Sequence, residues 1–302
     1  MNRNINKSIE DLTQIEKRYS KYFYKSDFDF RESVIARAFN SIVKKSNVFK
    51  KSINNLNIYF PNSSKISREF LLSAEKFPDH IWEPQTHKLL KILCKNKKNI
   101  FFGGAFFGDH ACLISKKFKK SMIYCFEPLP KTRHYLKKNK VVNNLNNLII
   151  SEKALFKKDN LKLYIKDKKD DDGDISLSSN KNTSNKYFLT ETLDNYCKKN
   201  NINKIDLLMI DVEGNELNVL LGAKKLLKLG NVENIIFEIH SNYVDWKNGL
   251  VNTPIIRLLK KNNFKIYSIR DCHSNIKLRN KIELLNLNNT YLKGPNHGFN
   301  LI

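Results

Sequence analysis

The sequence has little glycine and proline, 10 and 7 residues among 302, which excludes a fibrous or linker-dominated chain. Its five cysteines are scattered, and no two form a Cys-x-x-Cys pair. An odd number of cysteines in a chain of this length argues against a disulfide framework, so we expect reduced thiols. No apolar run approaches the roughly 18 residues of a membrane-spanning helix, and the first residues lack the apolar core of a signal peptide. These absences predict a cytoplasmic protein.

The chain is also poor in acidic residues: 30 Asp and Glu face 54 Lys and Arg, a formal net charge of +24. Such a charge favours an anionic partner, either nucleic acid or a membrane surface. The excess is spread evenly along the chain, however, whereas nucleic-acid modules concentrate it on one face or arm. The basic residues are mostly Lys and accompany many Asn and Ile, a bias typical of AT-rich coding sequences. We therefore do not expect a nucleic-acid partner, and we keep peripheral association with the inner membrane surface as an alternative.

Three zones follow one another along the chain. In residues 1–80, apolar positions recur at spacings of three and four, which predicts a helical N-terminal extension. Within it, residues 54–67 are polar and typical of turns. Residues 81–270 alternate short apolar runs with amphipathic stretches, and residues 271–302 form a C-terminal tail.

The alternation in the central zone predicts an α/β fold. The apolar runs that predict strands lie at 99–103, 122–127, 148–151, 206–211, 234–240 and 264–269. The stretches that predict helices lie at 108–118, 130–142, 193–200, 216–228 and 253–263. Such a pattern is typical of a doubly wound, mostly parallel sheet, in which ligands bind at the carboxyl ends of the strands.

One polar stretch, residues 166–186, interrupts the alternation. Its acidic cluster at 170–174 could suggest a calcium loop, which would need an acid at position 168 and Glu at position 179. Lys168 and Ser179 stand there instead. We therefore expect a solvated loop.

Small residues follow the first predicted strand, in the run Gly103–Asp109. They let backbone N–H groups and a helix N-terminus approach a ligand closely. The spacing of Gly104 and Gly108 is not the dinucleotide-binding fingerprint and fits the shorter turn that cradles S-adenosylmethionine. About twenty residues on, Glu127 ends the second strand, where an acid accepts hydrogen bonds from ribose hydroxyls. Pro128 then stops the strand.

Acidic residues also end the fourth and fifth predicted strands. Asp211 could orient a cofactor or an acceptor hydroxyl and Glu213 could act as a base, or both could cap the helix after Gly214. Strand alternation places Glu238 and His240 on one face, where the acid would raise the pKa of the imidazole. Asp211, Glu238 and His240 could also hold a divalent cation, although we do not predict a metal.

Together these residues resemble the FkbM-type family of S-adenosylmethionine-dependent O-methyltransferases, over about residues 81–270. The motifs that carry the resemblance are FEPLP (126–130) with the asparagines at 139, 143 and 144, ETLD (191–194), DLLMIDVEGNE (206–216) and FEIH (237–240). The resemblance implies a seven-stranded methyltransferase sheet and an S-adenosylmethionine cofactor. It also implies the order of the contacts: the glycine turn at the amino-acid end, Glu127 at the ribose, Glu152 near the adenine and Asp211 near the sulfonium.

Two family positions differ in this chain. Phe102 stands where the family usually has Asp, and Phe106 where it usually has Asn; Asp109 is the expected substitute. The predicted cofactor-binding residues are Gly104, Ala105, Gly108, Asp109, Glu127, Pro128, Glu152 and Asp211. The predicted catalytic residues are His240 as base, Glu213 as second choice, Glu238 orienting the imidazole, and Asp211.

These residues predict methyl transfer to a hydroxyl of a sugar or glycan precursor. A nucleic-acid methyltransferase is one alternative, but the Asn/Asp-Pro-Pro-Tyr/Phe motif of amino-methylating enzymes is missing after the fourth strand. A non-catalytic, methyltransferase-like binding module is another, favoured by Phe102 and Phe106 in the glycine turn.

Overall fold

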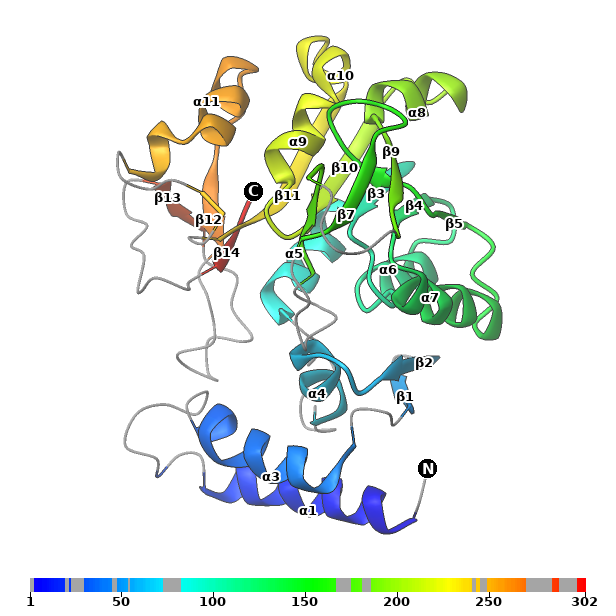
Figure 1. The fold of residues 1–302 in the computed structure, drawn as a ribbon, viewed down its shortest axis with the longest axis vertical. Helices are drawn as coiled ribbons and strands as arrows, with labels where there is room; N and C mark the ends of the chain where they lie inside the picture. The colour runs from blue at the N-terminus through cyan, green and yellow to red at the C-terminus, as the bar shows by residue number, and fades with distance from the viewer. Residues whose placement is uncertain are drawn as a thin grey trace.

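The structure is a computed structural model that describes residues 3–19, 22, 30–44, 48–53, 55–72, 83–166, 175–180, 186–240, 243–244, 249–269, 284–287 and 298–302. A layered α/β body fills the upper part of Figure 1, and N-terminal helices and a hairpin lie below it. Among the described residues, no helix has the length and apolar character needed to cross a membrane.

An eight-stranded sheet forms the centre of the body. Its five adjacent parallel strands are β5 (Leu148–Ser151), β4 (Met122–Phe126), β3 (Asn99–Gly103), β10 (Ile205–Ile210) and β11 (Val232–His240). The sheet continues through β14 (Gly298–Leu301), antiparallel to β11, then β12 (Tyr267–Ile269) and β13 (Leu284–Asn286). The predicted α/β class with a parallel sheet is confirmed, and in the described part of the chain the sheet has eight strands rather than the seven expected.

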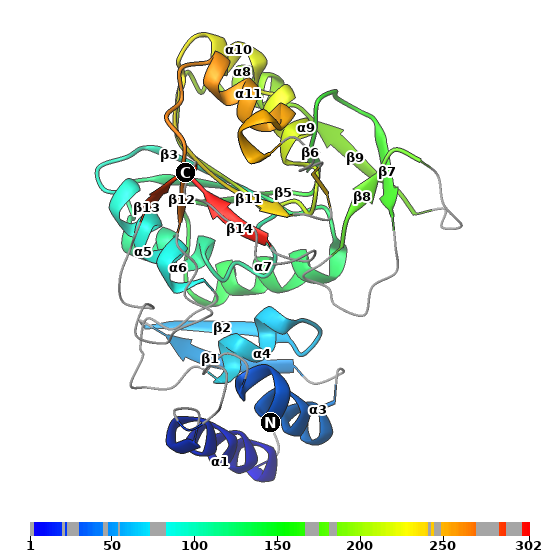
Figure 2. The same ribbon diagram turned by 90° about the vertical axis from the view of Figure 1, so that its left-hand side faces the viewer.

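Helices cover both faces of the sheet (Figure 2). One face carries α5 (Pro84–Leu93), α6 (Ala111–Lys117) and α7 (Pro130–Val142). The other carries α8 (Leu193–Lys199), α9 (Glu216–Leu221), α10 (Lys224–Lys228), the short η3 (Leu250–Asn252) and α11 (Pro254–Lys261). Side chains along β3 divide between the two cores: Ile100 and Phe102 pack with the first group, and Phe101 packs with the second. This division follows because successive side chains of a strand point to opposite faces.

Several predicted boundaries differ from the structure by more than one residue. The helix expected at 216–228 is two helices, interrupted at Gly222, where a Cβ atom would lie 2.2 Å from the Phe156 carbonyl oxygen. The helix expected from residue 108 begins at Ala111, because Gly108 adopts a left-handed φ of +89° that a helix does not accept. The strand expected at 264–269 is shortened to β12.

A second, four-stranded sheet flanks the first. It contains β6 (Ala154–Leu155), β9 (Phe188–Glu191), β7 (Lys162–Ile165) and β8 (Leu177–Ser178), in that order. The polar stretch 166–186, expected to be a loop, therefore contributes β8, which pairs antiparallel with β7. The acidic cluster at 170–174 lies outside the described residues.

The N-terminal segment contains helices in the two stretches whose apolar spacing predicted them, α1 (Arg3–Tyr19) and η2 (Arg31–Ile35) followed by α3 (Ala36–Ile42). A further helix, α4 (Lys65–Leu72), was not expected. It also contains an antiparallel hairpin of β1 (Val48–Ile53) and β2 (Leu56–Pro61). Strand β2 lies in the stretch 54–67, where we expected polar turns. Strand β2 buries alternate residues, Leu56, Ile58 and Phe60. This period of two is typical of a half-buried strand, and the surrounding Asn and Ser residues obscured it.

Candidate functional site

A pocket opens at the carboxyl ends of the parallel strands. It encloses about 720 Å³ of space, open solvent at its mouth included. Polar lining comes from Glu127 after β4 and from Asp211, Glu213 and Asn215 after β10. The apolar lining residues are Ile66, Phe106, Phe126, Leu129, Ala154, Leu155, Leu163, Ile175, Leu177 and Val212.

The turn after β3 packs tightly against the end of β10. Gly104 has a left-handed φ of +79°, and a Cβ atom there would lie 1.7 Å from the carbonyl oxygen of Asp211. No residue with a side chain fits this contact. The glycine therefore lets two pocket-lining loops meet, which the predicted role in cofactor contact did not include.

Glu127 is the buried acid of the pocket, with 4% of its surface exposed. One carboxylate oxygen accepts a hydrogen bond from the Phe106 amide at 2.8 Å, and the other accepts from the Leu129 amide and the Thr132 hydroxyl, both at 2.9 Å. Burial raises the pKa of Glu127 to about 7, and the three donors lower it in part. Phe106 aims its amide at the acid from a left-handed φ of +48°, a conformation uncommon outside glycine.

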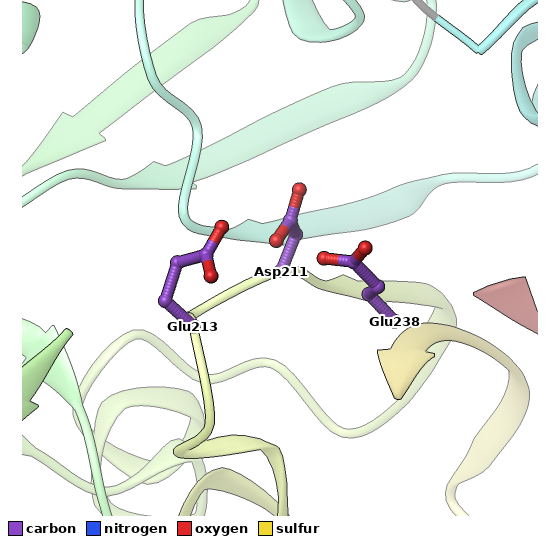
Figure 3. Close-up of side chains that lie close together, drawn as sticks. All are labelled: Asp211, Glu213 and Glu238. Carbon is purple, nitrogen blue, oxygen red and sulfur yellow. The ribbon is translucent and has the colours of Figure 1, made fainter. Parts of the chain in front are cut away.

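Three carboxyl groups gather beside the pocket, and Figure 3 shows them turned toward one another. Asp211, Glu213 and Glu238 each offer an oxygen, and these oxygens lie within 4.8 Å of one another. Burial raises the pKa of Asp211 to about 6, while a hydrogen bond from Glu238 lowers it. Burial and the charge of Asp211 hold the pKa of Glu238 well above its ordinary value. Glu238 is therefore the protonated partner that donates to Asp211.

The loop after β10 has a strained backbone. Glu213 and Gly214 are both left-handed, with φ of 52° and 94°, and such strain often lies at functional sites. The buried Glu216 holds the loop, because one of its carboxylate oxygens accepts hydrogen bonds from the amides of Val212 and Gly214. We had not predicted this role for Glu216.

The structure divides the predicted site residues into two groups. Those that line the pocket are Gly104, Glu127, Pro128, Asp211 and Glu213. Those outside the lining are Ala105, Gly108 and Asp109, which belong to the same turn, Glu238, which contacts Asp211, and Glu152.

Three predicted site residues lie elsewhere than the sequence suggested or are only partly described. The Glu152 side chain is 74% exposed and lies 3.6 Å from Arg133, outside the pocket where we expected the adenine contact. His240 ends β11, but its side chain lies outside the described part of the structure. Asp109 is buried, and burial raises the pKa of its carboxyl group.

Sequence reasoning missed the apolar walls of the pocket. Leu163 from β7, with Ile175 and Leu177 from the stretch read as a loop, line one side. Asn215 joins this side to the loop after β10, since its Nδ2 donates to the Leu177 carbonyl at 2.8 Å. The alternation of Ile175 and Leu177 was the available signal. No sequence signal marked Ile66, which belongs to α4, well before the other pocket-lining residues in the chain.

Comparison with known proteins gives a family for part of the chain. The methyltransferase FkbM domain matches residues 103–266, more than half of the sequence. No curated protein matches the chain.

Solved structures resemble the chain only distantly. TYW2 from M. jannaschii, in complex with AdoMet, aligns with 14% identity and a TM-score of 0.38 over 86% of this chain and 85% of its own. A SAM-dependent methyltransferase from Agrobacterium tumefaciens aligns with 8% identity and a TM-score of 0.43 over 84% and 69%. The assignment to a family therefore rests on the sequence match. By that match, the chain belongs to the FkbM methyltransferase family.

Proposed function

We propose that the protein transfers a methyl group from S-adenosylmethionine to a hydroxyl of a sugar or glycan precursor. The observation that carries the proposal is the buried carboxylate of Glu127, which lies at a strand end beside the glycine turn and lines the pocket. Three donors hold its two oxygens, and a carboxylate can accept about four hydrogen bonds. Capacity therefore remains for a ribose hydroxyl.

The pocket residues fit this cofactor. Glu127 would hold the ribose, and the turn at Gly104 with Asp211 would hold the amino-acid end and the sulfonium. The apolar residues Leu129 and Leu155 would suit the adenine, which favours apolar walls. When bound, S-adenosylmethionine supplies an electrophilic methyl group on a sulfonium centre. The chain itself must orient the acceptor and take up its proton.

Glu213 and His240 are the candidates for the base. Glu213 lines the pocket, which supports it as the group that removes the proton from the acceptor hydroxyl. His240 remains the other candidate from the sequence. Glu238 donates to Asp211, so it would keep Asp211 ionised and oriented. A divalent cation is not part of the proposal.

Two phenylalanines had favoured a non-catalytic module. Phe102 is 3% exposed and packs in the core, and the Phe106 ring lies 4.8 Å from that of Phe107. Both departures from the family pattern therefore have packing roles. They need not indicate a degraded cofactor turn.

Calorimetry with S-adenosylmethionine and with S-adenosylhomocysteine tests the cofactor. We expect wild-type protein to bind both, and Glu127→Ala to lose binding. Glu233→Ala is the matched control, because Glu233 pairs with Lys97 and Lys204 away from the pocket. Wild-type protein that binds neither compound would refute the proposal. Labelled methyl transfer to glycan acceptors and to RNA then distinguishes the acceptor classes.

A further inference from the structure

The described residues of 48–72 form a unit of β1, β2 and α4, which we call the hairpin–helix unit. Figure 2 shows its hairpin beside α7, on the face of the sheet that α7 covers. Asn139 on α7 and Asn143, which follows the last residue of that helix, bond to the open edge of β2. Asn143 accepts from the Asn57 amide at 2.7 Å and donates to the Asn57 carbonyl at 2.9 Å. Helix α7 thus satisfies a strand edge that would otherwise be exposed.

An aromatic cluster also packs the hairpin–helix unit against the glycine turn beside the pocket. Phe60 of β2 stacks on Phe107 of the glycine turn, with ring centroids 5.3 Å apart. Phe70 of α4 meets both rings, at 5.2 Å and 5.7 Å. All three side chains are fully buried, and aromatic pairs in this arrangement add stability beyond their burial. The unit and the glycine turn therefore share one core.

Helix α4 is held at both ends within the unit. At its start, the Ser64 hydroxyl accepts a hydrogen bond from the Ser67 amide at 3.0 Å, which caps the first turn. At its end, the Lys51 ammonium donates to the carbonyls of Phe70 and Leu71, at 2.6 Å and 3.1 Å. Ile66 lies in the first turn and lines the pocket.

Ile66 and Phe106 are both apolar residues of the pocket lining. Both pack against the core that the hairpin–helix unit shares with the sheet, and both line the pocket with Glu127. The Phe106 amide also donates to the Glu127 carboxylate. Ile66 therefore brings an apolar side chain from outside the sheet into the pocket that the predicted ribose-binding acid also lines.

We propose that Ile66 is a cofactor-binding residue, held by the hairpin–helix unit so that its side chain packs on the bound cofactor beside Phe106 and Glu127. The proposal rests on the proposed function. It gives the N-terminal segment a direct part in the site: an apolar wall that covers the cofactor and excludes water from it. Burial of an isoleucine side chain is large enough to affect binding measurably.

The test is calorimetry with S-adenosylhomocysteine on Ile66→Ala. We expect affinity to fall about tenfold, as truncation of a buried aliphatic contact implies, and Ile66→Leu to restore most of it. Ile42→Ala is the matched control, because Ile42 lies exposed on α3 outside the pocket. Thermal melting of each variant separates loss of binding from loss of fold.

A second variant tests whether the hydrogen bonds between Asn143 and β2 hold the hairpin–helix unit in place. Asn143→Asp keeps the acceptor for the Asn57 amide but removes the donors to the carbonyls of Asn57 and Asn139. We expect faster hydrogen exchange in β2 together with weaker S-adenosylhomocysteine binding, whereas Asn146→Asp, at an exposed site, should change neither.

The outcomes separate this inference from the proposed function. Wild-type protein without affinity for the cofactor contradicts the proposed function itself. If the wild-type protein binds and Ile66→Ala binds equally well, only the role of Ile66 is contradicted. The same conclusion follows if Ile66→Ala loses affinity only in proportion to a fall in its melting temperature.

Discussion

Asn139 pairs with both backbone polar groups of Tyr59, a residue 80 positions earlier in the chain. Its Oδ1 accepts a hydrogen bond from the Tyr59 amide at 2.7 Å, and its Nδ2 donates to the Tyr59 carbonyl at 2.9 Å. The same Nδ2 donates to the Phe107 carbonyl at 2.9 Å. One fully buried side chain thus joins β2, α7 and the turn beside the pocket.

Substitution Asn139→Ala should destabilise the protein by about 3 kcal/mol, because it leaves several buried backbone groups without partners. Urea denaturation measures this loss. Asn146→Ala, at an exposed position, is the control and should change stability by less than about 0.5 kcal/mol. A loss no larger than the control's would mean that water replaces the Asn139 side chain.

Alanine substitutions at two glycines with left-handed φ distinguish the cost of backbone strain from the cost of a steric clash. A Cβ atom on Gly104 would meet the Asp211 carbonyl, whereas one on Gly230 would meet nothing within 4 Å. Gly230→Ala should cost about 1–2 kcal/mol from the backbone alone. Gly104→Ala should cost at least about 4 kcal/mol, because the loops must also separate. Equal losses in urea denaturation would contradict the packing role of Gly104.

Glu127 should give stability and cofactor binding opposite dependences on pH. Its pKa is raised from 4.5 to about 7 in the folded protein, so the folded state holds more protons than the unfolded state between these values. Its contribution to stability therefore falls as pH rises from about 4.5 to 7. Affinity for S-adenosylhomocysteine should rise over the upper part of this window, because the ionised carboxylate is the better acceptor for ribose hydroxyls.

Calorimetric titrations between pH 5.5 and pH 8 measure the dependence of affinity. Glu127→Gln should bind weakly and show a flat profile. If affinity in Glu127→Gln still rose with pH as steeply as in the wild type, the pH dependence would belong to another group, such as Asp211, whose pKa is raised to about 6.

Substitution Glu213→Gln should lower methyl transfer about 10²–10⁴-fold if Glu213 removes the acceptor proton. Affinity for S-adenosylhomocysteine should change little, because Gln has nearly the same shape. His240→Ala, tested in parallel with labelled cofactor and a glycan acceptor, identifies the base. The base is the residue whose substitution causes the larger loss of turnover while cofactor affinity stays unchanged.

Chemical groups at strand ends were predictable from sequence because they follow local patterns. The apolar runs locate β3, β4, β5 and β10 within one residue, since buried strands are continuous in the sequence. Glu127 and Asp211 follow those strands directly, so their place at the edge of the sheet was determined as well. The hydrogen bond between Glu238 and Asp211 could not be predicted, because it depends on how closely β10 and β11 bring the two carboxyl groups together.

The sequence by itself determined the α/β class, the glycine turn and the acids at the carboxyl ends of the strands, because each depends on neighbouring residues. The tertiary structure decided the rest of the pocket. Ile66 reaches it from α4, beside a hairpin whose Tyr59 bonds to Asn139, 80 residues further along the chain. Leu177 reaches it from the second sheet, through its pairing with β7. Such contacts depend on distant backbone edges and shared cores, and local sequence patterns do not encode which distant segments will meet.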